Sequence, residues 1–326
     1  MTSGLALCLA GLVVLAVGAE MLVRGASRLA AALGVTPLMV GLTVVAVGTS
    51  MPELAVGVIA SQQDNGGLAV GNIAGTNVCN ILLILGLSAL LRPLPLHLRV
   101  LRIDLPTMVV ACAAMAVLAL DGVLSRLDGT LLLAAGVAYT AAVVRVARRE
   151  TRAVKAEFRD MYGDDAGKGR VAAPAWARYA TVLVAGIALT IVGAEWLVDG
   201  AVALARRFGV SDALIGLTVV ALGTSAPELA TTCVATLRDE RDVAVGNLLG
   251  SSIYNVLAIL AVTCLASPQG LPVERELLLF DIPLMTGVAI LCVPVFVTGR
   301  RVSRAEGGLF VAVYLIYLSF LLAFRV

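Results

Sequence analysis

Charge is the scarcest property of this sequence. Asp, Glu, Lys and Arg make up only 14% of its 326 residues, whereas a soluble domain carries about 25%. Hydrophobic residues make up 60%, and the mean hydropathy is +0.99. These values exclude an ordinary soluble domain and predict an integral membrane protein. The net charge of +2 does not indicate a particular partner. The sequence shows no basic face with interleaved aromatic residues, which would be typical of nucleic-acid binding.

Histidine and paired cysteines are scarce too. The only histidine is His97, and the six cysteines show no CxxC pair and no Cys/His metal spacing. We therefore expect buried, reduced thiols and no cofactor. An enzyme is disfavoured, because a hydrolase nucleophile at Ser50 or Ser225 would need a nearby general base. His97 lies in a short loop and has no counterpart elsewhere in the chain.

The long apolar runs match bilayer-spanning helices, which need roughly 20 residues each. We predict an all-α polytopic membrane protein with ten transmembrane helices. The first is expected to be retained, because no Lys or Arg precedes it as in a cleavable signal peptide. The predicted spans are 4–30, 35–60, 68–91, 104–120, 129–147, 178–205, 212–236, 243–265, 280–298 and 306–324.

The two halves of the sequence are a repeat. The segment from Gly18 to Asn80 matches the segment from Gly193 to Asn255 at a constant offset of 175, without a gap. Five spans per half is an odd number, so the second half must enter the membrane from the opposite side. This predicts two inverted five-helix repeats, an architecture that places a transporter's site near the membrane midplane. The repeats are expected at 1–147 and 178–326, with a linker at 148–177.

Lys and Arg are unequally divided between the two predicted sides of the membrane. One side receives the linker and most loop arginines, and by the positive-inside rule it should be cytoplasmic. Both termini are then extracytoplasmic. We expect a multi-pass protein of the cell membrane, the inner one where there are two, with the lipid bilayer as its partner and no obligate protein partner.

One stretch occurs twice: GLTVVAVGTSMPELAVGVIA at 41–60 and GLTVVALGTSAPELATTCVA at 216–235. Each copy places a glutamate, Glu53 or Glu228, in an apolar span, where an acid indicates function by default. The proline before each glutamate removes a helical hydrogen bond and should free a backbone carbonyl. A proline-kinked helix with an arginine-paired glutamate is the structural alternative, but neither span has Arg or Lys near its glutamate. Hydroxyls that share a face with the glutamates are those of Thr49, Ser50, Thr224 and Ser225.

A polar helical stripe follows each motif, GNIAGTNVCN in the first half and GNLLGSSIYN in the second. Its members recur every four residues and therefore share one face. Hard oxygen ligands suit Ca²⁺, Mg²⁺ and Na⁺ rather than soft metals. Polar contacts between closely packed helices are the alternative explanation. We favour ion coordination for Thr76, Asn80, Ser251 and Asn255; Asn72, Asn77, Asn247 and Ser252 are weaker candidates.

Other acids in the spans favour structural or gate-lining roles. Glu20 has Arg24 four residues later, a spacing that predicts an ion pair. In the second half, Glu195 has Asp199 at the matching position instead. Two aspartates that precede prolines are predicted helix N-caps, Asp104 and Asp281.

The paired GTSxPE motifs, each followed by a GNxxGxNxxN-like helix, resemble the α-repeats of the Ca²⁺/cation antiporter superfamily. The resemblance covers nearly the whole chain and is closest to bacterial and archaeal calcium/sodium antiporters. It implies four ion sites at the midplane, glutamates that bind Ca²⁺ and Na⁺ in turn, and sliding of the first and sixth helices. The implied ligands are Glu53, Glu228, Thr49, Ser50, Thr224, Ser225, Thr76, Ser251, Asn80 and Asn255, with backbone oxygens of Ala46 and Ala221.

The sequence also departs from that family. Some members carry an acid at the position of Asn255, and Ser252 stands where an asparagine is usual. These changes leave the Na⁺ stoichiometry and any K⁺ coupling open. We expect a secondary antiporter that exchanges Na⁺ for Ca²⁺ by alternating access. An H⁺-coupled or K⁺-dependent exchanger is the alternative, and broken helices in inverted halves disfavour a channel.

Overall fold

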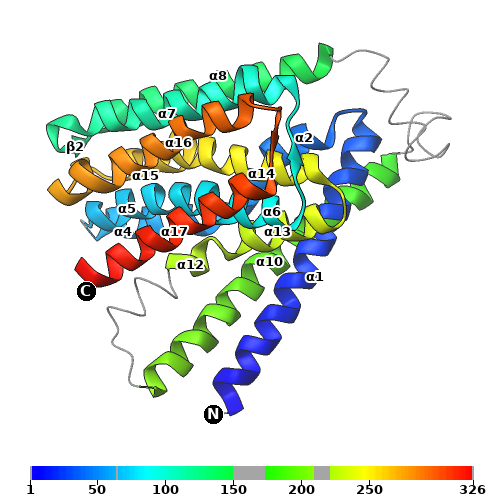
Figure 1. The fold of residues 1–326 in the computed structure, drawn as a ribbon, viewed down its shortest axis with the longest axis horizontal. Coiled ribbons are helices and arrows are strands. Elements are labelled where there is room, and N and C mark those ends of the chain that lie inside the picture. The colour runs from blue at the N-terminus through cyan, green and yellow to red at the C-terminus, as the bar shows by residue number, and fades with distance from the viewer. Residues whose placement is uncertain (1, 64, 150–172, 209–220, 325–326) are drawn as a thin grey trace.

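A computed structural model describes residues 2–63, 65–149, 173–208 and 221–324 as a bundle of long helices (Figure 1). The first half contains α1 (Thr2–Leu33), α2 (Pro37–Val40), α3 (Ala46–Thr49), α4 (Met51–Gln62), α5 (Gly66–Val78), α6 (Gly86–Leu91), α7 (Leu105–Leu118) and α8 (Arg126–Arg149). The second contains α10 (Ala173–Arg207), α12 (Ala221–Thr224), α13 (Ala226–Leu237), α14 (Arg241–Tyr254), α15 (Ala261–Ala266), α16 (Ile282–Val297) and α17 (Arg304–Phe324).

Eight of the described helices are long and apolar enough to cross a membrane. A ninth candidate is the pair Pro37–Thr49 and Met51–Gln62, which bends by 41° at its break. The predicted multi-pass helical fold is therefore confirmed. Of the predicted span 212–236, the part up to residue 220 lies outside the described residues, as do residues 150–172 of the predicted linker.

Wider π-helical turns interrupt the helices at corresponding places in the two halves. Such turns occur frequently at functional sites. In each half, one of these turns contains the last residue of the polar stripe. Asn80 lies in the turn that begins at Cys79, and Asn255 is the first residue of the other turn. The π-helical segments are Gly41–Val45, Cys79–Leu85, Val100–Asp104, Asn255–Leu260 and Leu277–Asp281, and a 3₁₀ turn spans Ala119–Asp121.

Two short antiparallel strand pairs tie loops of the first half to loops of the second, a feature that the sequence did not predict. β1 (Leu94–Pro95) pairs with β4 (Arg301–Val302), and β2 (Val123–Leu124) pairs with β3 (Leu271–Pro272). Each ladder is only two residues long. The loops between α6 and α7 and between α16 and α17 therefore meet at one end of the bundle.

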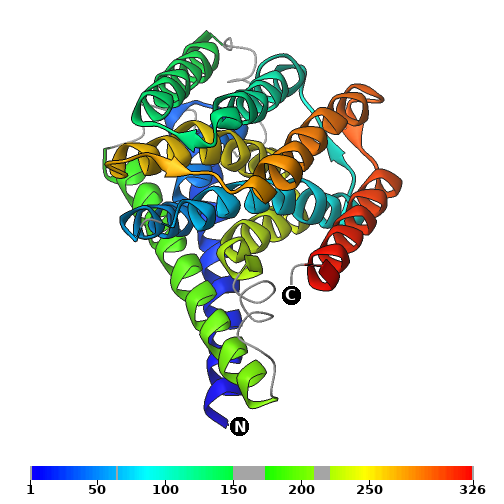
Figure 2. The ribbon, with the colours of Figure 1, turned by 90° about the vertical axis from the view of Figure 1, so that its left-hand side faces the viewer.

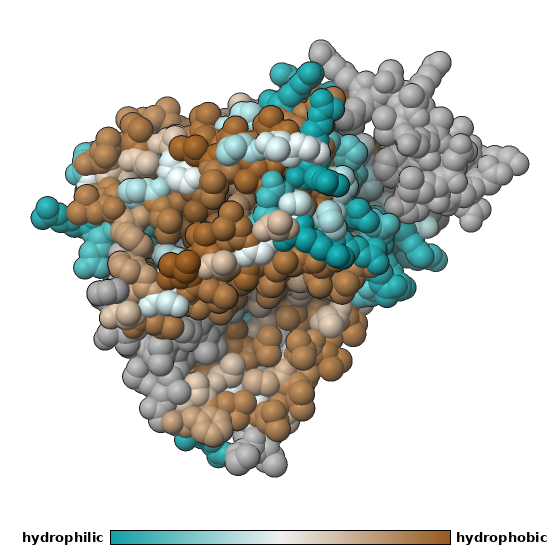
Figure 3. All heavy atoms as spheres, viewed as in Figure 1, coloured by the Kyte–Doolittle hydropathy of each residue, from teal (hydrophilic) through white to brown (hydrophobic). Residues whose placement is uncertain are grey.

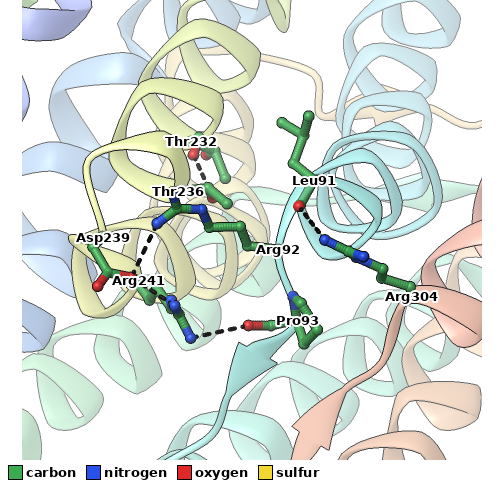
Figure 4. Close-up of polar contacts among 8 residues, drawn as sticks. All are labelled: Leu91, Arg92, Pro93, Thr232, Thr236, Asp239, Arg241 and Arg304. Carbon is green, nitrogen blue, oxygen red and sulfur yellow. Dashed lines mark hydrogen bonds and ion pairs between the residues drawn. The ribbon is translucent and has the colours of Figure 1, made fainter.

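That end is the Arg-rich end, which we define by Arg92, Arg238, Arg241, Arg301 and Arg304. The carboxylate of Asp239 binds Arg92 at 3.5 Å and Arg241 at 2.6 Å, and Arg304 donates to the carbonyl of Leu91 (Figure 4). In Figure 3, hydrophilic surface gathers on the right-hand side, and hydrophobic surface covers most of the rest of the visible face. These five arginines, which the sequence assigned to one side of the membrane, thus lie at one end of the bundle.

Helices α1 and α10 lie antiparallel and extend away from the other helices (Figures 1 and 2). Glycines recur every seventh residue along their interface: Gly11, Gly18 and Gly25 in α1, and Gly186, Gly193 and Gly200 in α10. A methyl group at Gly25 would lie 2.7 Å from the backbone nitrogen of Leu183. The two backbones are therefore in direct contact, as small residues permit in membranes.

Charged groups connect α1 to the end of α13. Glu20 binds Arg24 at 2.6 Å, which confirms the predicted ion pair. Arg238, directly after α13, binds the same carboxylate through two atoms, at 2.7 and 2.9 Å. Glu20 therefore has a structural role in this conformation, in line with the sequence.

The prediction of side-chain N-caps at Asp104 and Asp281 is wrong. Both helices continue backward through π-helical turns, so these aspartates face no free helix N-terminus and make no capping hydrogen bond. Instead, Tyr139 donates to Asp104 at 2.9 Å and Tyr317 donates to Asp281 at 3.3 Å. The roles are structural, as expected, but they link neighbouring helices.

The α1–α10 contact predicts a strong cost for a larger side chain at Gly25. Gly25→Val should force the helices apart and destabilise the protein by about 1–3 kcal/mol, as overpacking does. The control is Gly287→Val, because a methyl group at Gly287 would meet nothing within 4 Å. The melting temperature of the detergent-solubilised protein measures both. Equal melting temperatures would contradict the backbone contact.

Candidate cation site at two helix breaks

Both GTSxPE motifs break their helices at the serine. Ser50 has φ −84° and ψ 11°, and Ser225 has φ −87° and ψ 2°, between a short helix and the next one. Each following proline lies in the first helical turn, where its missing N–H is tolerated. Glu53 and Glu228 lie in the same first turns, α4 and α13, where the helix dipole favours a negative charge.

The two breaks meet, although they are far apart in the sequence. The hydroxyl of Ser50 donates to Oε1 of Glu228 at 3.1 Å. Glu53 and Glu228 are close enough for their charges to interact, and both side chains are fully buried. One carboxylate from each half therefore faces the other inside the bundle.

Further contacts across the halves surround these carboxylates. The hydroxyls of Thr49 and Ser251 also lie near Glu228. Ser251 also donates to the carbonyl of Ala46 at 3.4 Å. The structure thus brings the first motif together with the second motif and with the second polar stripe.

Several buried oxygens in this region have no hydrogen-bond partner within the described chain. They are both carboxylate oxygens of Glu53, Oε2 of Glu228, Oγ of Ser225 and Oδ1 of Asn80 and Asn255. Burying unpaired polar oxygens is costly. A group of unpaired acceptors that includes two carboxylates is suited to a hard cation, which would satisfy them together.

This donor set does not resemble a transition-metal centre. Within the ranges that the structure describes, no three His, Cys, Asp or Glu residues form a metal-binding group. The remaining oxygens belong to hydroxyls, amides and backbone carbonyls. Such oxygens suit a hard cation rather than a soft metal.

Most members of the polar stripes are buried: Thr76, Asn77, Asn80, Asn247, Ser251, Ser252 and Asn255. Burial therefore does not separate the predicted ligands from the weaker candidates. Asn77 instead connects helices: it donates to the carbonyl of Ser252 at 3.1 Å and accepts from Nδ2 of Asn255 at 3.1 Å. This contact holds the amide of Asn255 while its Oδ1 stays without a partner. The helix-contact explanation therefore applies to Asn77.

The second motif also borders a cavity of about 360 Å³ between α4, α10 and α12. Pro52 and Thr224 line it from the two motifs, and Glu195 and Asp199 line it from α10. The half-buried Thr224 ends α12, the helix that Ala221 begins. The cavity is consistent with the gate-lining role expected for Glu195.

The hydroxyl of Thr232 is a polar group beside the site that was not predicted from the sequence. Thr49 donates to Oδ1 of Asn247 at 3.1 Å, and Nδ2 of Asn247 donates to the hydroxyl of Thr232 at 3.1 Å. Thr232 lies four residues after Glu228 and shares its helix face, which was a usable signal. The repeat comparison concealed it, because the matching position in the first half is Gly57.

The chain is similar to known proteins over most of its length. The family described as sodium/calcium exchanger protein matches residues 3–145 and 178–323. The sodium/calcium exchanger MaX1 of Methanosarcina acetivorans is 32% identical over 96% of both chains. The inner membrane protein YrbG of Escherichia coli is 35% identical over 81% of this chain and 80% of its own. The solved structure of the sodium-calcium exchanger NCX_Mj superposes with a TM-score of 0.84 at 30% identity, over 98% of both chains.

The facing carboxylates predict that a bound cation stabilises the fold. Ca²⁺ at 100 times its dissociation constant should add about 2.7 kcal/mol by linkage, and Na⁺ should also stabilise at saturation. The Glu53→Gln/Glu228→Gln double variant should lose this response. It should also melt above the wild type in choline chloride with a chelator, because the repulsion between the carboxylates is gone. Thermal denaturation measures both effects, and an unchanged Ca²⁺ response in the double variant would contradict the site.

Proposed function

Because this chain belongs to the sodium/calcium exchanger protein family, a family of membrane transporters rather than enzymes, we propose that it is a secondary antiporter that exchanges Na⁺ for Ca²⁺. Cation/Ca²⁺ exchange follows from the family. The proposal adds Na⁺ as the coupling ion and Glu53 and Glu228 as one shared site. The observation that carries it is the pair of buried, facing carboxylates with unpaired oxygens.

A shared site explains exchange in simple terms. Ca²⁺ takes 6–8 oxygen ligands, so one set of oxygens cannot serve Ca²⁺ and Na⁺ at full coordination together. Two carboxylates neutralise one Ca²⁺ or hold Na⁺ ions in its place. Mutually exclusive occupancy then couples the movement of one ion to that of the other.

The proposed ligands are the residues that the sequence assigned to the site. The two glutamates carry the charge, and hydroxyls, amides and carbonyls complete the shell. Cross-half contacts of Ser50 and Ser251 support this set, as does the burial of Thr76, Asn80 and Asn255. The full set is Glu53, Glu228, Thr49, Ser50, Thr224, Ser225, Thr76, Ser251, Asn80 and Asn255, with the backbone of Ala46 and Ala221.

We further propose that the chain forms ten transmembrane helices as two inverted repeats, 1–147 and 178–326. The π-helical turns at matching positions support this arrangement, as do the helix breaks at Ser50 and Ser225. The Arg-rich end is then cytoplasmic, with the linker 148–177 beside it and both termini on the opposite side of the cell membrane. The cavity beside Thr224 is the access route on that opposite side.

Two other couplings remain as second candidates. An H⁺-coupled exchanger would use the same glutamates and would respond to a pH gradient. A K⁺-dependent exchanger has support from the human sodium/potassium/calcium exchanger 3, which is 33% identical over 40% of this chain. The neutral Asn80 and Asn255 favour Na⁺ alone, because neither side chain adds a third carboxylate to the pair of glutamates.

Radiolabelled Ca²⁺ uptake into Na⁺-loaded proteoliposomes tests this function. The wild type should take up Ca²⁺ when an outward Na⁺ gradient is imposed, and much less with a pH gradient or K⁺ alone. Glu53→Gln and Glu228→Gln should each reduce uptake at least roughly 100-fold, because a cation of charge two loses half of its compensating charge, several kcal/mol in a buried site. Full Na⁺-driven uptake by either variant would refute the shared site, whereas uptake driven only by the pH gradient would refute Na⁺ coupling.

A further inference from the structure

Asn247 is held at both ends of its side-chain amide. It lies on α14, is fully buried and belongs to the second polar stripe. Its Oδ1 accepts from the hydroxyl of Thr49 at 3.1 Å, and its Nδ2 donates to Oγ1 of Thr232 at 3.1 Å. The three residues form a chain of hydrogen bonds that leads from the first motif to α13.

The single proton of the Thr49 hydroxyl has two acceptors in reach, and Oδ1 of Asn247 at 3.1 Å is nearer than the carbonyl of Ala46 at 3.4 Å. A hydroxyl has one proton and two lone pairs. When the proton is donated to Asn247, the lone pairs remain for other contacts. The Thr49 hydroxyl lies near Glu228, and a cation bound there requires lone pairs rather than a proton. An amide rotated by half a turn would instead donate to Thr49 and occupy one of those lone pairs.

At the matching positions of the first half, the last member of this chain has no counterpart. Asn72 matches Asn247 in the repeat, and Gly57 matches Thr232. Nδ2 of Asn72 has no hydrogen-bond partner among the described residues. Packing maintains the difference, since a methyl group at Gly57 would lie only 2.6 Å from Oγ1 of Thr263. Only one wall of the site is fixed in this way.

We propose that Thr232 is a positioning residue for cation binding. Through Asn247 it holds the proton of the Thr49 hydroxyl away from the site, so that the lone pairs are left for a cation beside Glu228. It belongs to no predicted ligand set and acts one helical turn away from that carboxylate. This inference rests on the proposed function, and it assigns to the second half a role that the first half lacks.

The test compares two buried threonines on the same face of α13. Thr232→Val removes the hydroxyl at almost constant volume. Thr236→Val is the matched control, because the Thr236 hydroxyl donates only to the backbone carbonyl of Thr232, at 2.8 Å (Figure 4). Thr232→Ser keeps a hydroxyl and should rescue. Thr232→Ala provides the same comparison if the valine variant does not fold.

Na⁺-driven Ca²⁺ uptake is measured over a range of Ca²⁺ concentrations. Thr232→Val should raise the half-saturating Ca²⁺ concentration roughly 3–10-fold, as loss of one orienting hydrogen bond does, with the maximal rate within about twofold of the wild type. Thr232→Ser and Thr236→Val should both stay near the wild-type value. In a Thr49→Val background, Thr232→Val should have no further effect, because it acts through Thr49.

Three results would overturn the inference while leaving exchange intact. They are equal effects of Thr232→Val and Thr236→Val, a change of the maximal rate alone, and a full additional effect in the Thr49→Val background. Failure of the proposed function gives a different result, since the wild type itself would then show no Na⁺-driven uptake.

Discussion

Two facing carboxylates inside an apolar bundle are the constraint on which this structure depends. Within the part of the chain that the structure describes, neither Glu53 nor Glu228 forms an ion pair with Lys or Arg, and both are fully buried. Charges in such a place repel each other and lose their hydration. A hydroxyl and the N-terminal turns of α4 and α13 compensate in part, and in the proposed function an exchangeable cation supplies the rest.

The backbone around the site follows from the same constraint. Irregular backbone at membrane depth is tolerated only inside protein or beside a cavity. The breaks at Ser50 and Ser225 satisfy this condition, because they meet in the centre of the bundle and one of them borders a cavity. The contact between α1 and α10 lies outside this centre. At its glycines, the two helix backbones touch directly.

The repeat made much of the site predictable. A constant offset of 175 identified both glutamates, their hydroxyls and the two stripes, and the prolines predicted the helix breaks. What an offset cannot give is contact between the halves. Three kinds of contact join segments that are far apart in the sequence, and no sequence pattern indicates that these segments meet. They are the hydrogen bond from Ser50 to Glu228, the Asn77–Asn255 contact and the strand pairs. Thr232 could not be found from the repeat for a different reason. The two halves differ at this position, and a repeat identifies only the residues that both halves share.

If Glu53 and Glu228 form one site that Ca²⁺ and Na⁺ occupy in turn, the two ions must compete for it. Equilibrium binding of radiolabelled Ca²⁺ to the purified protein, with increasing Na⁺, measures this competition. We expect one Ca²⁺ per chain, full displacement by Na⁺, and loss of that Ca²⁺ when either glutamate is neutralised. Two Ca²⁺ ions per chain, each lost separately with one glutamate, or Ca²⁺ binding that Na⁺ does not change, would contradict the shared site.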